Sequence, residues 1–73
     1  MRYPVFFEKS RTGYSAHVPD LPGCVAAGGT LYEVRRLIGE AMEMHIAGMR
    51  EDGDEIPEPP ALVEFVEVSA GDW

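Results

Sequence analysis

Two prolines and a glycine within five residues constrain this chain more than any other feature. They lie in the stretch Val18-Pro19-Asp20-Leu21-Pro22-Gly23-Cys24. Each proline fixes φ and removes an N–H donor, and Gly23 can adopt a positive φ at low cost. The carboxylate of Asp20 is placed to accept a hydrogen bond from a backbone N–H and close an Asx-type turn. The stretch therefore predicts a rigid turn built from Pro19, Asp20, Pro22 and Gly23.

The segments on either side of this turn have the hydrophobic alternation of short strands. Residues 3–9 place Tyr3, Val5 and Phe7 on one face, and residues 14–18 do the same with Tyr14, Ala16 and Val18. Because a polar turn separates the two segments, we predict a β-hairpin over residues 3–18. A third short strand is expected over residues 24–27, after the proline turn.

A single long helix is predicted over residues 30–52. Thr30 is a favourable N-cap and Glu33, three residues later, completes a capping-box pattern. Gly53 is placed to end the helix. The apolar residues recur at spacings of three and four and make one stripe: Leu31, Val34, Leu37, Ile38, Ala41, Met42, His45, Ile46 and Met49.

A final strand is predicted over residues 62–68, after a connector in which Pro57, Pro59 and Pro60 exclude a regular helix. This strand has apolar residues on both faces, so we expect cover on both sides, for which a second subunit is one source. The whole chain, residues 1–73, then forms one α+β domain of order β-β-β-α-β. The expected architecture is a two-layer sandwich, with an antiparallel sheet and the helix across one face.

The length of 73 residues limits the core that one chain can build. A domain of this size buries only about 60% of its unfolded surface, so we expect a homo-oligomer, a dimer or a tetramer. One cysteine, Cys24, and two histidines far apart in sequence, His17 and His45, predict no metal site. The absence of a membrane-length apolar run and of a signal-peptide pattern predicts a cytoplasmic protein that does not enter a membrane.

The charge of the chain is strongly negative and unevenly distributed. The net charge is −7, and no Lys or Arg follows Arg50. Such a surface repels phosphate, so we expect no direct binding of nucleic acid, whereas a basic protein partner would be attracted. The residues that we single out as partner-binding candidates are Asp20, Glu51, Asp52, Asp54, Glu55, Glu64 and Glu67.

Enzymatic activity is the weaker interpretation of these carboxylates. A two-metal nuclease needs carboxylates gathered around the ions, and Glu8, Asp20 and Glu64 lie on or beside predicted strands. The acidic composition, however, offers no basic groove for a nucleic acid backbone. We therefore predict no catalytic residues, no cofactor and no enzyme.

Several segments of the chain together resemble the HicB-like antitoxin family. The resemblance extends from about Tyr3 to Val68. Its most specific part is the Val-Pro-Asp-Leu-Pro-Gly-Cys run. It continues through Gly28-Gly29-Thr30-Leu31-x-Glu33, Glu40-Ala41-Met42-x-Met44-His45 and Asp52-Gly53-Asp54-x-Ile56-Pro57-x-Pro59. Two departures affect only local capping and packing: Gly29 stands where the family often has Asp, and Val34 where it often has Ala.

The resemblance implies a partial RNase H-like fold without a catalytic carboxylate set. It implies an antitoxin that silences a HicA toxin, a small basic ribonuclease with a double-stranded-RNA-binding fold, by covering its basic surface. Complete family members usually carry a C-terminal DNA-binding module. Because this chain reaches Trp73 directly after the last expected strand, we expect a short stand-alone member with no such module.

Two other functions stay open at this stage. One is an orphan homo-oligomeric domain of the same family that has no toxin partner and binds another protein. The other is a degenerate nuclease of the RNase H type.

Overall fold

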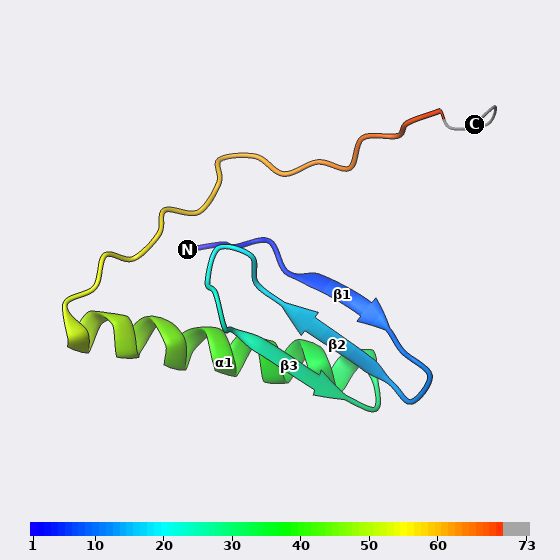
Figure 1. Ribbon diagram of the computed structural model, residues 1–73, viewed down its shortest axis with the longest axis horizontal. Helices are drawn as coiled ribbons and strands as arrows, with labels where there is room; N and C mark the ends of the chain where they lie inside the picture. The colour runs from blue at the N-terminus through cyan, green and yellow to red at the C-terminus, as the bar shows by residue number, and fades with distance from the viewer. Residues whose placement is uncertain (70–73) are drawn as a thin grey trace.

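The computed structural model describes residues 1–69 and contains three strands followed by one long helix (Figure 1). The strands are β1 (Phe6–Lys9), β2 (Tyr14–His17) and β3 (Val25–Gly28), and the helix is α1 (Leu31–Asp52). The sheet is antiparallel with the order β1-β2-β3. The predicted α+β arrangement, with one helix against one face of an antiparallel sheet, is confirmed. Our expectations for Ala70–Trp73, including Trp73, lie outside the described residues.

The strand register separates a covered face of the sheet from an open one. Phe7 pairs with Ala16, which pairs with Ala26, and this row faces α1. The neighbouring row, Phe6 with His17 and then Val25, lies on the opposite face. The rings of Phe6 and His17 are in contact there in a tilted arrangement, with 5.4 Å between centroids. The helix thus covers only one side of the sheet, as in a two-layer domain.

The core is small and lies between α1 and the two strands that the helix contacts, β2 and β3. Seven hydrophobic residues are buried there: Tyr3, Ala16, Val18, Leu21, Cys24, Val34 and Ile38. The apolar stripe predicted for α1 supplies Val34 and Ile38, and most of its other members are half-buried. Because α1 makes no close contact with β1, Phe7 stays 39% exposed although it lies on the covered face.

Both ends of α1 have the expected caps. The hydroxyl Oγ1 of Thr30 accepts a hydrogen bond from the N–H of Glu33 at 3.0 Å. The carboxylate of Glu33 accepts from the N–H of Gly29, at 2.8 Å, one residue earlier than a strict capping box has it. At the other end Gly53 adopts φ 74°, and its N–H donates to the carbonyl of Arg50. The left-handed conformation favours glycine and stops the helix.

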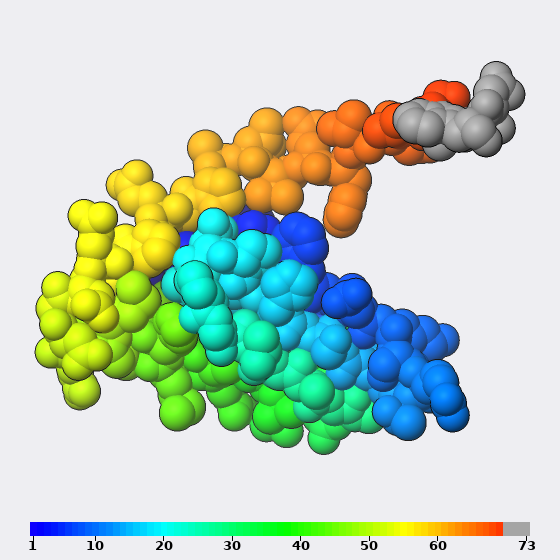
Figure 2. Space-filling model, in the orientation of Figure 1, coloured from blue at the N-terminus to red at the C-terminus, as the bar shows by residue number. Residues whose placement is uncertain are grey.

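The predicted strand over residues 62–68 is not formed in this single chain. These residues are extended and exposed, and they pair with no strand among residues 1–69. Figure 2 shows the segment projecting from the body of the molecule. The prediction is therefore wrong for the isolated chain, because hydrophobic alternation fits a strand but a strand also needs a neighbouring edge. The radius of gyration of 14.9 Å, against about 11 Å for a compact chain of this length, reflects the projection.

Candidate functional site

The turn between β2 and β3 is held by three backbone hydrogen bonds. The N–H of Val18 donates to the carbonyl of Cys24 at 3.1 Å, that of Leu21 to Val18 at 3.0 Å, and that of Cys24 to Leu21 at 3.0 Å. Gly23 has φ 86°, which an L side chain rarely adopts. The side chain of Leu21 is completely buried. The turn is thus a rigid part of the core, and its anchor, Leu21, is a residue that sequence analysis did not single out.

Asp20 does not make the hydrogen bond expected of it. Within residues 1–69, the bonds that close the turn join backbone atoms, and none uses the carboxylate of Asp20. The Asx-type role predicted for this residue is therefore wrong. The backbone of a turn with two prolines and a positive-φ glycine closes without a side-chain acceptor, which leaves the half-buried carboxylate available to another molecule.

Four acidic residues gather where α1 ends. This acidic end consists of Glu51, Asp52, Asp54 and Glu55, all of them exposed. Within the described part of the chain the one ion pair is elsewhere on the helix, between Arg36 and Glu40 at 3.0 Å. The carboxyl end of a helix carries partial negative charge, so carboxylates there are unfavourable for the helix itself. The acidic end therefore opposes the helix dipole and has no ion-pair partner inside the described chain.

The remaining acidic candidates lie apart from this end. Glu64 and Glu67 are exposed on the projecting segment, which leads away from the carboxyl end of α1 (Figure 1). Glu8 lies on β1 and Asp20 in the turn. Among residues 1–69, no three His, Cys, Asp or Glu side chains lie close enough to hold a metal ion. The structure does not bring Glu8, Asp20 and Glu64 together, so the carboxylate cluster required by a nuclease is not formed by these three residues.

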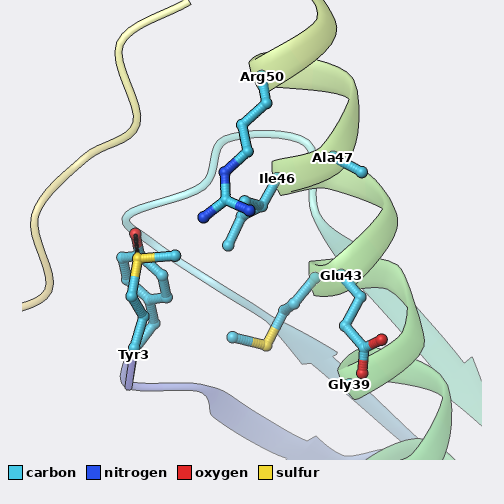
Figure 3. A pocket seen from close by; sticks show the side chains of 8 residues that line it. Tyr3, Gly39, Glu43, Ile46, Ala47 and Arg50 are labelled. Atoms are coloured by element: carbon cyan, nitrogen blue, oxygen red, sulfur yellow. Dashed lines mark hydrogen bonds between the residues drawn. The ribbon is translucent and has the colours of Figure 1, made fainter.

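An open hollow of about 440 Å³ lies between the start of the chain and α1. Figure 3 shows Tyr3 on one side of it and Glu43, Ile46 and Arg50 of α1 on the other. Met1, Gly39, Met42 and Ala47 complete its lining. The hollow is mostly apolar, and its small residues Gly39 and Ala47 leave the helix surface uncovered. The one signal for this hollow in the sequence is a glycine, Gly39, beside the apolar stripe of the helix.

The thiol of Cys24 is buried in the core, and burial raises the pKa of Cys24 above its ordinary value. A protonated thiol in this position packs as a small apolar group rather than reacting as a nucleophile.

Across residues 1–69, α1 lacks the combination of length and apolar character that a membrane-crossing helix requires.

The model of the HicB-like antitoxins of bacterial toxin–antitoxin systems matches residues 3–70 of this chain. The chain belongs to the HicB-like antitoxin family. Among solved structures, this HicB-like chain is similar to a chain of the HicA3–HicB3 toxin–antitoxin complex, with a TM-score of 0.68 and 34% identity. That match covers 80% of this chain and 67% of the other. The crystal structure of the antitoxin HicB3 gives the same TM-score and identity over 81% of this chain and 43% of that one.

Sequence relatives of the HicB-like chain come from a phage, a bacterium and an archaeon. A 14.9 kDa protein of the rep-hol intergenic region of Haemophilus phage HP1 is 42% identical over 66 residues, which are 90% of this chain and 50% of that protein. A UPF0150 protein of Helicobacter pylori is 42% identical over 45 residues, 62% of each chain. A UPF0150 protein of Archaeoglobus fulgidus is 34% identical and is covered over its whole length, with 97% of this chain. The chain thus spans about half of the phage relative and all of the archaeal one.

Proposed function

We propose that this HicB-like protein is an antitoxin that binds a small basic ribonuclease of the HicA type and blocks its RNA-binding surface. The observation that carries the proposal is the acidic end of α1, Glu51, Asp52, Asp54 and Glu55. These carboxylates are exposed, lack cationic partners within residues 1–69 and lie where the helix dipole opposes them. Their presence at a cost to the helix is explained if they serve a partner.

The mechanism is occlusion by charge and shape. A ribonuclease that binds RNA presents Lys and Arg side chains to the phosphates. Carboxylates held on a rigid helix end can occupy the same positions, and the association is then fast and sensitive to salt. The half-buried Asp20, which has no hydrogen bond within the described chain, adds a further carboxylate on a rigid turn. Glu64 and Glu67 extend the negative surface along the projecting segment.

This role is non-enzymatic, since the protein acts by covering another molecule. We place it in the cytoplasm, where a toxin that cleaves mRNA meets its substrate and where the single thiol of Cys24 stays reduced.

The direct test is co-expression with any small basic protein encoded beside this chain. The complex is weighed by light scattering, and the ribonuclease activity of the basic protein is measured with and without this chain. A stable hetero-complex with suppressed RNA cleavage supports the proposal. Unchanged cleavage in the presence of excess antitoxin contradicts it.

The role of the acidic end is tested by matched charge removal. The double variant Glu51→Gln/Asp52→Asn should weaken binding of the basic partner and reduce its salt dependence. The control Glu8→Gln/Glu43→Gln removes the same charge from exposed residues elsewhere. Equal effects of the two double variants would show that net charge alone, and not the acidic end, drives binding.

An orphan homo-oligomer that binds another protein is the second candidate. The exposed apolar residues of the projecting segment favour it, because they indicate association irrespective of a toxin. A neighbouring gene for a small basic protein with a histidine on a helix would favour the antitoxin. Absence of such a neighbour, together with a homo-oligomer that captures no ribonuclease, would favour the orphan.

A further inference from the structure

The outer edge of β3 carries unpaired backbone groups. β3 pairs with β2 along one side, and no strand lies on its other side among residues 1–69. The N–H of Val18 donates to the carbonyl of Cys24, which makes these two residues a hydrogen-bonded pair at the end of the β2–β3 ladder. Because such pairs alternate along an antiparallel ladder, the N–H and C=O groups of Val25 and Ala27 point outward. A strand of another molecule can pair with them.

One side of α1 has a regular pattern that is separate from the core stripe. Six residues recur there at spacings of three and four, so they lie in one row along the helix. This acidic–apolar stripe consists of Glu33, Leu37, Glu40, Met44, Gly48 and Glu51. Met44 is 75% exposed, and Leu37 is half-buried. The stripe therefore offers apolar contact area between carboxylates, which a helix side turned only to water does not need.

The acidic–apolar stripe lies on the β3 side of the helix. The row of α1 that faces the sheet includes the buried Val34 and Ile38, and the hollow beside Tyr3 lies on one side of this row. By helical spacing the stripe lies on the other side. Because α1 contacts β3 and β2 but not β1, this other side borders the outer edge of β3. A strand added there has α1 across one of its faces, where its side chains meet Leu37 and Met44.

Charge is distributed unequally between the two sides of α1. The stripe contains three glutamates, and all the arginines of the helix lie outside it: Arg35, Arg36 and Arg50. Arg36 reaches Glu40 from the neighbouring row, at 3.0 Å, and the carboxylate of Glu33 accepts from the N–H of Gly29. Glu51 has no ion-pair partner within residues 1–69. The stripe keeps a net negative charge, which is complementary to Lys and Arg side chains of an incoming strand.

We propose that the outer edge of β3 and the acidic–apolar stripe together bind a β-strand of the basic partner protein. This inference rests on the proposed function, to which it adds the surface and the kind of element that docks. The side chains of the docked strand that face α1 are apolar residues and Lys or Arg. Backbone hydrogen bonds to Val25 and Ala27 determine its register, and contacts with Leu37 and Met44 supply affinity. The stripe ends at Glu51, so this surface is continuous with the acidic end of α1.

A matched pair of single variants tests the stripe. Met44→Glu places a carboxylate among the apolar contacts, and Tyr32→Glu makes the same change at a residue of α1 outside the stripe. The two side chains are 75% and 77% exposed, so neither change disturbs the core. The probe is the small basic protein that co-purifies with this chain. Met44→Glu should raise the dissociation constant at least about tenfold, whereas Tyr32→Glu should leave it within about twofold.

Amide hydrogen exchange tests the pairing of strands directly. In the complex of the full chain with the same basic protein, the amides of Val25 and Ala27 should exchange at least about tenfold more slowly than in the chain alone, because they become hydrogen-bonded. The control amides are those of Phe7 and Lys9. By the same alternation they point outward on β1, away from the proposed contact. Their exchange should not change when the basic protein binds.

The outcomes separate this inference from the function on which it rests. A stable complex in which Val25 and Ala27 exchange as fast as in the free chain overturns the docking at β3 and leaves the antitoxin role standing. Equal dissociation constants for Met44→Glu and Tyr32→Glu do the same. A chain that binds no basic protein overturns both proposals.

Discussion

The hydroxyl of Tyr3 donates a hydrogen bond to the carbonyl oxygen of Pro57, 54 residues further along the chain. The bond joins the start of the chain to the segment that follows α1. Tyr3 is itself buried in the core, so the bond also connects the packing of the sheet to the position of the segment. It holds Pro57 beside the core, at a point that precedes the projecting residues 62–68.

Removing this bond should loosen the segment and destabilise the fold modestly. We expect Tyr3→Phe to lower the free energy of unfolding by about 1 kcal/mol, because the ring still fills its site while the carbonyl of Pro57 loses its donor. Urea unfolding measures the change. The control is Tyr32→Phe, which removes a hydroxyl from an exposed residue of α1. Equal stabilities of the two variants would show that the bond contributes nothing.

The acidic end should show opposite effects on folding and on binding. Removal of two carboxylates from the last turn of α1 with Glu51→Gln/Asp52→Asn should raise the free energy of unfolding by roughly 0.5–1 kcal/mol at low salt. The gain should shrink as salt screens the charges. The same variant is expected to bind the basic ribonuclease more weakly. A variant that loses both stability and binding would indicate a structural rather than a partner-directed role.

Two glycines should respond oppositely to alanine. A Cβ on Gly13 would clash with the backbone carbonyl of Gly28 and lie 3.0 Å from the Cα of Gly29. Because backbone atoms cannot move aside cheaply, we expect Gly13→Ala to cost at least about 2 kcal/mol. Apart from its chain neighbours and the backbone of its own helix, a Cβ on Gly48 in α1 meets no atom within 4 Å. Gly48→Ala should therefore stabilise the helix, by up to about 1 kcal/mol. Thermal unfolding of both variants gives the comparison.

The buried thiol predicts a loss of stability in alkali. Burial holds the pKa of Cys24 in the folded chain above its ordinary value of 9.0. The unfolded chain then releases the thiol proton at a lower pH than the folded chain does. The contribution of the protonated thiol to the free energy of unfolding is fully present below pH 9.0. It is lost as the pH rises from 9.0 through the pKa of Cys24 in the folded chain. Cys24→Ala should remove this slope, which urea unfolding between pH 7 and pH 10 would reveal. An identical slope in Cys24→Ala would assign it to other groups.

Local sequence determined the elements whose backbone hydrogen bonds are made between residues close together in the chain. Thr30 and Gly53 mark the ends of a helix whose backbone hydrogen bonds join residues close together in sequence, so its bounds follow from residues within one or two turns. The hairpin and the turn from Val18 to Cys24 are likewise closed by neighbours in sequence. Prolines and a positive-φ glycine restrict the backbone before any tertiary contact forms.

Tertiary structure decided the features that depend on contacts between residues far apart in the chain. Alternation predicted a strand over residues 62–68, but a strand forms only against another edge, and none is reached within residues 1–69. The Asx-type bond of Asp20 was plausible locally, yet the folded turn closes through its backbone, and Leu21 supplies its buried anchor. The hollow between Tyr3 and α1 exists because the helix packs on β2 and β3 and leaves β1 uncovered. Such contacts join residues that are far apart in the chain, so no local pattern of side chains encodes them.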